Sequence, residues 1–249
     1  MRLTVLGANG TYPTPGRPAS GYLVESQGAV VWLDAGPGTF PAALARGVPE
    51  RVAALVLSHV HADHCSDVLA LLNFLRYGPR PRDPLPLLAP EGVVDRLAAF
   101  AGAGPDHDFF GVFDVRVVDA GDEATFGHLT ITFGAAVHPV PAVCAAVSDG
   151  ARRIVYSGDT GPGGDLPRLA ARAELLLCEA TYQGEPGENR YPYHLHAAEA
   201  GALARDAAVD RLVLTHIAPT LDTDISAAEA AATFGRPVEI AAPGAEIDV

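Results

Sequence analysis

The chain has 249 residues, of which 49% are hydrophobic, so it can bury a large core, and we expect one domain over residues 1–249. Its formal net charge is -13 and all 17 basic residues are arginines, so the surface should repel polyanions, which disfavours the binding of an extended nucleic acid. No apolar run reaches the ~20 residues of a membrane span, so we expect no membrane contact.

The N-terminal apolar run is short. Residues 1–6 are followed by Gly7 and predict a first strand rather than a secretory signal. Cys65, Cys144 and Cys178 are odd in number and widely spaced, which favours reduced thiols over a disulfide framework. We therefore expect a cytoplasmic protein.

Strands and helices alternate through the first half of the chain. Strands are expected at 22–25 and 30–34, and the continuous apolar run 52–57 predicts a short buried strand. Helices are expected at 68–75 and 93–100, on either side of a proline-rich connection, and both should pack against a sheet.

The second half predicts a second sheet and two helices. Its strands are expected at 115–118, 129–133, 143–147 and 154–156, with an Asp-Gly turn at 149–150. One helix is expected at 197–208. The other is expected at 226–234, with Ser226 as the N-cap and Glu229 three positions later.

The segment Ser-His-Val-His-Ala-Asp-His, at 58–64, directly follows the strand at 52–57. His59 and His61 are two residues apart and can converge on one cation, while Asp63 and His64 can turn toward a second. Imidazole and carboxylate are ligands that suit Zn, Mn or Fe. The alternative, a solvated polar loop, would need three of the nine histidines to cluster by chance.

Further ligand-type residues follow other strands. His138 comes after the strand at 129–133, Asp159 follows the strand at 154–156, and His216 ends an apolar run. Taken singly, each fits an ordinary polar turn. Their shared position at the carboxyl ends of strands indicates that they meet at one rim, which favours a site for two metals.

These residues resemble the metallo-β-lactamase superfamily, whose members carry His-x-His-x-Asp-His followed by a separate His, a bridging Asp and a last His. The resemblance covers nearly the whole chain and implies an α/β fold, a four-layer αββα sandwich with the site at one edge of the two sheets. It also implies two divalent metal ions, with Zn favoured over Mn or Fe. The implied ligands are His59, His61 and His138 for one metal, Asp63, His64 and His216 for the other, and Asp159 as the bridge.

Two further motifs are similar to those of the phosphodiesterase branch typified by tRNase Z. These are the Glu-Ala-Thr that begins at Glu179 and the helix-start motif that begins at His194. By resemblance, Glu179 orients His194, and His194 acts on the leaving group. Asp63 is assigned as a ligand first and as a base for a metal-bridging hydroxide second. His196 stands where that branch more often has Thr or Ser, and we interpret it as a helix cap.

Several segments narrow the resemblance to the actinobacterial atypical class II cyclic-nucleotide phosphodiesterases. They are residues 18–24, the motif from His59, residues 156–161 and residues 214–219. This resemblance implies a small substrate such as 3′,5′-cyclic AMP. One departure from tRNase Z supports that expectation, because no long basic insertion lies between His138 and His216. A second departure, Cys178 where tRNase Z commonly has His, concerns the polar network behind Glu179.

Other functions remain as alternatives. The same ligands would serve a tRNA 3′-end endonuclease or a thioester or lactone hydrolase, and a metal-binding sensor without turnover is the non-enzyme alternative. Relatives are often dimers, which implies a homodimer. Residues near the predicted site are candidates for contacting the base, namely Tyr191, Tyr193, Arg190 and the loop 9–17. The densest basic group, Arg76, Arg80 and Arg82, is interpreted as a solvated helix end and loop in preference to a phosphate-binding patch. His107 and His128 are expected at the surface.

Overall fold

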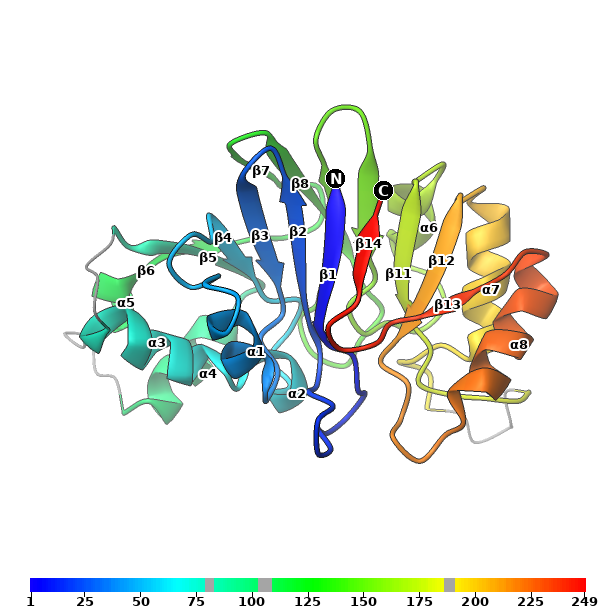
Figure 1. The fold of residues 1–249 in the computed structure, drawn as a ribbon, viewed down its shortest axis with the longest axis horizontal. Helices are drawn as coiled ribbons and strands as arrows, with labels where there is room; N and C mark the ends of the chain where they lie inside the picture. The colour runs from blue at the N-terminus through cyan, green and yellow to red at the C-terminus, as the bar shows by residue number, and fades with distance from the viewer. Residues whose placement is uncertain (79–82, 103–108, 186–190) are drawn as a thin grey trace.

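The computed structural model describes residues 1–78, 83–102, 109–185 and 191–249, and Arg80, Arg82, His107 and Arg190 lie outside these ranges. Two seven-stranded sheets face each other in the described part (Figure 1). The first has the order β14 (Glu246–Asp248), β1 (Arg2–Gly7), β2 (Gly21–Ser26), β3 (Ala29–Leu33), β4 (Ala54–Val56), β5 (Leu85–Ala89) and β6 (Phe113–Val117). The second has the order β13 (Glu239–Ile240), β12 (Arg211–Thr215), β11 (Leu175–Glu179), β10 (Arg153–Tyr156), β9 (Val143–Ser148), β8 (Leu129–Ala135) and β7 (Glu123–Phe126).

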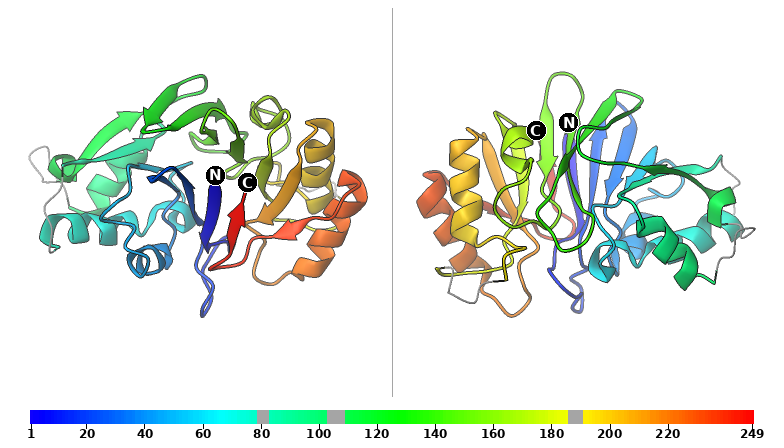
Figure 2. Two further views of the ribbon diagram at one scale, coloured as in Figure 1. Left: turned by 45° about the horizontal axis from the view of Figure 1, so that its top comes forward. Right: turned by 180° about the vertical axis from the view of Figure 1, so that it is seen from behind.

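Helices cover the outer face of each sheet, as both views in Figure 2 show. Those beside the first sheet are α1 (Thr39–Leu44), α2 (Ala62–Cys65), α3 (Val68–Tyr77), α4 (Val93–Phe100) and α5 (Phe109–Val112). Those beside the second sheet are α6 (Leu166–Ala170), α7 (Ala197–Asp206) and α8 (Thr223–Phe234). Among the described residues, no helix combines the length and the apolar character needed to cross a bilayer.

Three hydrophobic clusters separate these layers. Strand β3 contributes to two of them because its side chains alternate between its faces. Val31 and Leu33 enter the core between the sheets, while Val30 and Trp32 pack toward the helices. A third cluster lies between the second sheet and α6 to α8. These layers form the four-layer αββα sandwich that the sequence predicted.

The strands bring several carboxyl ends to one edge of the sandwich. Strands β3 and β4 are parallel, and β10, β11 and β12 are parallel to one another. Strand β8 is antiparallel to β9, which is antiparallel to β10, so β8 runs in the same direction as β10. The loops after β8, β10 and β12, which carry predicted ligands, therefore leave the second sheet at the same edge.

One predicted strand belongs to the other sheet. The strand expected at 115–118 is β6, and it pairs in parallel with β5 at the edge of the first sheet, not with β8 in the second. The prediction was wrong because β5 lies at the end of the proline-rich connection and was not recognised. Without β5, the strand predicted at 115–118 had no partner in the first sheet.

The start of α8 was also predicted wrongly. The helix begins at Thr223, and Asp222 caps it by accepting a hydrogen bond from the backbone N–H of Asp224. Ser226 lies inside the helix, fully buried, and its hydroxyl accepts a hydrogen bond from the Gln183 side chain. In contrast, α4 has its predicted bounds, and His128 is exposed at a turn, as expected.

All three cysteines are free and buried, in agreement with the sequence prediction. Burial raises the pKa of the Cys65 and Cys144 thiols to about 12, and it also raises that of Cys178. Because only a thiolate reacts readily, we expect negligible labelling of the native protein by a thiol reagent at pH 8. Three thiols should react after unfolding in urea. Rapid labelling of any one in the native state would contradict this packing.

Candidate metal centre

The segment after β4 changes direction between its four ligand-type residues. His59 lies three residues after the end of β4, and His61 is still extended, with φ -63° and ψ 145°. Helix α2 then begins, and it carries Asp63 and His64. The change from extended to helical backbone sends the first two side chains and the last two toward different points, as the spacing suggested.

His59 and His61 converge with His138 and Asp159. The Nδ1 atom of His61 lies 3.1 Å from the Nε2 atom of His59 and 3.1 Å from the Nε2 atom of His138. The Oδ2 atom of Asp159 lies 3.6 Å from His59 Nε2. One ligand atom from each residue lies within 4.8 Å of every other, so these four residues could hold one cation.

A second group forms around the other oxygen of Asp159. The Oδ1 atom of Asp159 is 3.1 Å from His64 Nε2 and 3.4 Å from His216 Nε2. The Oδ2 atom of Asp63 is 3.1 Å from His216 Nε2 and 3.6 Å from His64 Nε2. The structure therefore brings all seven predicted ligand residues into two groups that share Asp159.

The donor atoms fit a cation in two respects. His64 Nε2 and Asp159 Oδ1 are buried and, although they lie 3.1 Å apart, neither makes a hydrogen bond in the described structure, and such polar atoms are costly to bury unless something satisfies them. The nitrogen separations of 3.1 Å around His61 are also close to the roughly 3.4 Å between two ligands of a tetrahedral zinc ion with Zn–N of about 2.1 Å.

The opposite ring nitrogens of three histidines are held by hydrogen bonds. His64 Nδ1 donates to Asp34 Oδ2 at 2.7 Å, and His138 Nδ1 donates to the backbone oxygen of Tyr193 at 3.3 Å. His216 Nδ1 lies 2.9 Å from the hydroxyl of Thr181. A hydrogen on Nδ1 leaves the lone pair on Nε2, which is the tautomer that a metal-binding imidazole needs.

Burial and charge set the protonation of the two groups. Burial lowers the pKa of His59, His61 and His138, to about 4 for His138, so these imidazoles are neutral and ready to act as ligands at pH 7. Burial acts to raise the pKa of Asp159, but His216 and His64 outweigh it and hold the pKa well below its usual range. The Asp159 carboxylate is therefore ionised.

Asp34 supports the loop, and the sequence analysis missed this role. It is fully buried at φ 56° and accepts hydrogen bonds from Ser58 N at 2.6 Å, Ser58 Oγ at 2.7 Å and Tyr156 OH at 2.6 Å, in addition to His64 Nδ1. A turn aspartate after an apolar strand was the only signal in the sequence. Its partners are far apart along the chain, so only the fold reveals them.

We expect Asp34→Asn to lower the free energy of unfolding by about 3 kcal/mol, measured by urea titration. An amide cannot accept all four hydrogen bonds, so at least one buried donor would face an N–H group. Asp114→Asn, at an exposed ion pair with Arg116, is the matched control and should change stability by less than about 0.5 kcal/mol. Equal effects of the two substitutions would contradict the role assigned to Asp34.

Glu179 and His194 form the predicted pair. Glu179 is fully buried at the end of β11, and its Oε1 atom lies 2.9 Å from His194 Nδ1. It also accepts hydrogen bonds from Thr160 N and from Thr181 Oγ1, both at 2.8 Å. Burial acts to lower the pKa of His194, but the hydrogen bond and the charge of Glu179 outweigh it and raise that pKa. The raised pKa favours the protonated form of His194, and its Nδ1 lies 4.0 Å from Asp159 Oδ2.

Thr181 connects this pair to the second ligand group, and the sequence analysis assigned it no separate role. Its hydroxyl donates to Glu179 Oε2 and lies 2.9 Å from His216 Nδ1, where it can accept the imidazole hydrogen. Cys178 points into the core beside α6 to α8, so it is not part of this network. His196 occupies the N-cap position of α7, as predicted, with its backbone N–H bonded to Glu199.

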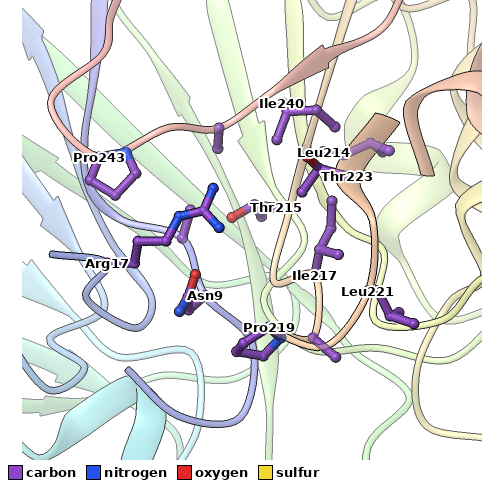
Figure 3. Close-up of a pocket in the computed structure, with 13 residues that line it drawn as sticks. Asn9, Arg17, Leu214, Thr215, Ile217, Pro219, Leu221, Thr223, Ile240 and Pro243 are labelled. Atoms are coloured by element: carbon purple, nitrogen blue, oxygen red, sulfur yellow. The ribbon is translucent and has the colours of Figure 1, made fainter. Parts of the chain in front are cut away.

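The loop 9–17 reaches the site through its backbone. The N–H of Thr11 donates to Asp63 Oδ2 at 2.9 Å. A Cβ at Gly10 would lie 2.6 Å from the carbonyl oxygen of His216, a residue with φ 53°, so only glycine fits beside this ligand. Arg17 and Asn9 line a small cavity together with Thr215 and Ile217 (Figure 3). At about 30 Å³, that cavity has room for little more than a water molecule.

Residues 30–217 match the family described as the Beta-lactamase superfamily domain. The chain belongs to this superfamily. A protein of Mycobacterium leprae is 37% identical over 255 residues, covering 100% of this chain and 89% of the relative. Ribonuclease Z of Myxococcus xanthus is 29% identical over 305 residues, covering 100% and 98%.

The same family appears among solved structures. The crystal structure of the metallo-β-lactamase fold protein YhfI from Bacillus subtilis superposes with a TM-score of 0.87 at 25% identity, covering 99% of this chain and 98% of that one. This β-lactamase superfamily protein therefore has the metallo-β-lactamase fold and is a metallohydrolase. Its His and Asp cluster could bind metal ions.

Proposed function

We propose that this superfamily member is a dinuclear metal-dependent phosphodiesterase that hydrolyses a small phosphodiester such as 3′,5′-cyclic AMP. One observation carries the proposal. The two oxygens of Asp159 each belong to one ligand group, and the Glu179–His194 pair ends 4.0 Å from the same carboxylate. An acid is thus placed beside a site for two cations, which is the arrangement that phosphodiester cleavage needs.

When bound, two cations, Zn in preference to Mn or Fe, would lower the pKa of a shared water and neutralise charge on the phosphoryl oxygens. Side chains of the protein would supply the base and the acid of the reaction. Asp63 would hold one cation and serve as a base toward the attacking water, while the N–H of Thr11 fixes its carboxylate. His194, held by Glu179, can protonate the departing alkoxide, a contribution of roughly 10²- to 10⁴-fold.

The similarity to a ribonuclease Z supports a phosphodiester as the substrate, because RNA is a polymer of such esters. A thioester or lactone gains little from a cationic His194, because cleavage of a carboxyl ester does not require that pair. The net charge of -13 favours a small substrate over tRNA. Several described arginines are also already paired with carboxylates, namely Arg2, Arg51, Arg116, Arg168, Arg205 and Arg211.

The test uses purified protein loaded with Zn or Mn. Cyclic AMP, cyclic GMP, 2′,3′-cyclic nucleotides and bis(p-nitrophenyl) phosphate should be offered in parallel, and we expect turnover of at least one cyclic nucleotide. If none of the four classes is hydrolysed, the proposal is wrong. A precursor tRNA assayed across a salt series addresses the second candidate, a tRNA 3′-end endonuclease, which predicts cleavage that falls steeply with salt.

A further inference from the structure

A groove of about 410 Å³ opens directly beside the first ligand group. It lies between α2, α3 and α4, and His61 lines it while also contacting His59 and His138. The other walls are largely apolar and include Val60, Leu69, Leu97 and Phe100. A volume of this size falls within the range of small-molecule sites.

Two side chains that line the groove are exposed and do not stabilise the fold through any contact among the described residues. Phe100 at the end of α4 is 79% exposed, so its ring is available to a ligand. Arg96, one turn earlier, is exposed, and its guanidinium makes no ion pair or hydrogen bond within the described ranges. Arg96 therefore places a positive charge, with no ion-pair partner among the described residues, in a groove that His61 also lines.

Charge distinguishes this groove from another one at the site. A second groove, of about 520 Å³, is lined by His138, and Glu91 and Asp119 line it as well. An anionic ester is repelled by those carboxylates and attracted by Arg96. The apolar wall, the exposed aromatic ring and the arginine together fit a nucleobase, which is flat, stacks on aromatic faces and carries hydrogen-bond acceptors.

We propose that this groove binds the nucleoside part of the substrate, with Phe100 stacking on the base and Arg96 donating hydrogen bonds to base or ribose acceptors. The inference rests on the proposed phosphodiesterase function. It makes both residues specificity determinants of the same reaction. His61 connects the two regions, so a phosphate held at the ligand groups places its nucleoside at the mouth of the groove.

The experiment compares Phe100→Ala and Arg96→Ala with two matched controls. Tyr77→Ala removes an aromatic ring that is 71% exposed on α3 but lies outside the groove, and Arg172→Ala removes an arginine that lines a different groove. Binding of AMP to metal-loaded protein is measured by calorimetry. Turnover is measured with cyclic AMP and with methyl p-nitrophenyl phosphate, which has no nucleoside.

We expect Phe100→Ala to weaken AMP binding roughly tenfold and to lower kcat/KM for cyclic AMP, relative to methyl p-nitrophenyl phosphate, by a similar factor through KM. Arg96→Ala should act in the same direction, and neither control should change these values. Unchanged AMP affinity in both groove variants would overturn the inference. A change in sedimentation behaviour without a change in AMP affinity would also overturn it, because the groove would then be a contact between copies of the chain.

The design separates this inference from the proposed function. If the unmodified protein hydrolyses methyl p-nitrophenyl phosphate and binds AMP with no dependence on the groove, the phosphodiesterase proposal stands and the groove assignment fails. If no phosphodiester is hydrolysed, the phosphodiesterase proposal fails, and AMP binding to the four variants still tests the groove.

Discussion

Asp159→Ala should remove nearly all phosphodiesterase activity and reduce the metal content of the purified protein below two ions per chain. Each oxygen of Asp159 belongs to a different ligand group, so no other residue can replace it in both. Its loss also removes the charge that balances His64 and His216, which lie within 3.4 Å of Oδ1. Metal content is measured by plasma mass spectrometry, and activity is measured with cyclic AMP.

Asp206→Ala is the control for this substitution. Asp206 is an exposed carboxylate on α7 that pairs with Arg205, so its loss should leave metal content and activity unchanged. A circular dichroism spectrum matching that of the unmodified chain would show that Asp159→Ala is folded. A folded Asp159→Ala protein that keeps two metals and full activity would rule out a bridging role for Asp159.

His194→Ala should lower kcat for cyclic AMP by roughly 10²- to 10⁴-fold while the metal content stays unchanged. The reason is that His194 contacts Glu179 through Nδ1 and belongs to neither of the two groups that share Asp159, so its loss removes an acid and leaves both groups intact. Bis(p-nitrophenyl) phosphate tests separately whether the loss of kcat comes from the lost protonation of the leaving group. Its p-nitrophenolate departs without protonation, so the loss of kcat should be much smaller with this substrate.

Glu179→Gln should reproduce much of that effect, and the double variant should be little worse than either single one, because the two side chains act as a unit. His128→Ala is the control, since His128 lies at an exposed turn. An equal loss with cyclic AMP and with bis(p-nitrophenyl) phosphate would contradict the acid role of His194. Loss of metal from His194→Ala would place it among the ligands instead.

The site residues that could be predicted are those that lie just after a strand in the sequence, because the strand itself is recognisable from its own residues. His59 to His64, His138, Asp159 and His216 each follow a buried apolar strand, and the parallel arrangement of β10 and β12 then brings their carboxyl ends together. Strand and helix patterns were readable for the same reason, since burial imposes a period of two or 3.6 on the side chains.

The parts that could not be predicted depend on contacts between distant residues. Asp34 accepts a hydrogen bond from Tyr156, which is 122 positions away, and Thr181 contacts His216, which is 35 positions away. Neither pairing leaves a local pattern. The same holds for β6, whose sheet depends on its neighbour β5 and not on its own residues.

The proposed ligands come from both halves of the sandwich. His59, His61, Asp63 and His64 follow a strand of the first sheet, whereas His138, Asp159 and His216 follow strands of the second. Cations bound between them would cross-link the two halves at their open edge, and binding energy there would become folding energy. At a free metal concentration a thousand times Kd, this linkage contributes about 4 kcal/mol per site. The proposed metal centre would then also stabilise the fold, so that removal of the metal by a chelator would lower the free energy of unfolding of the whole domain.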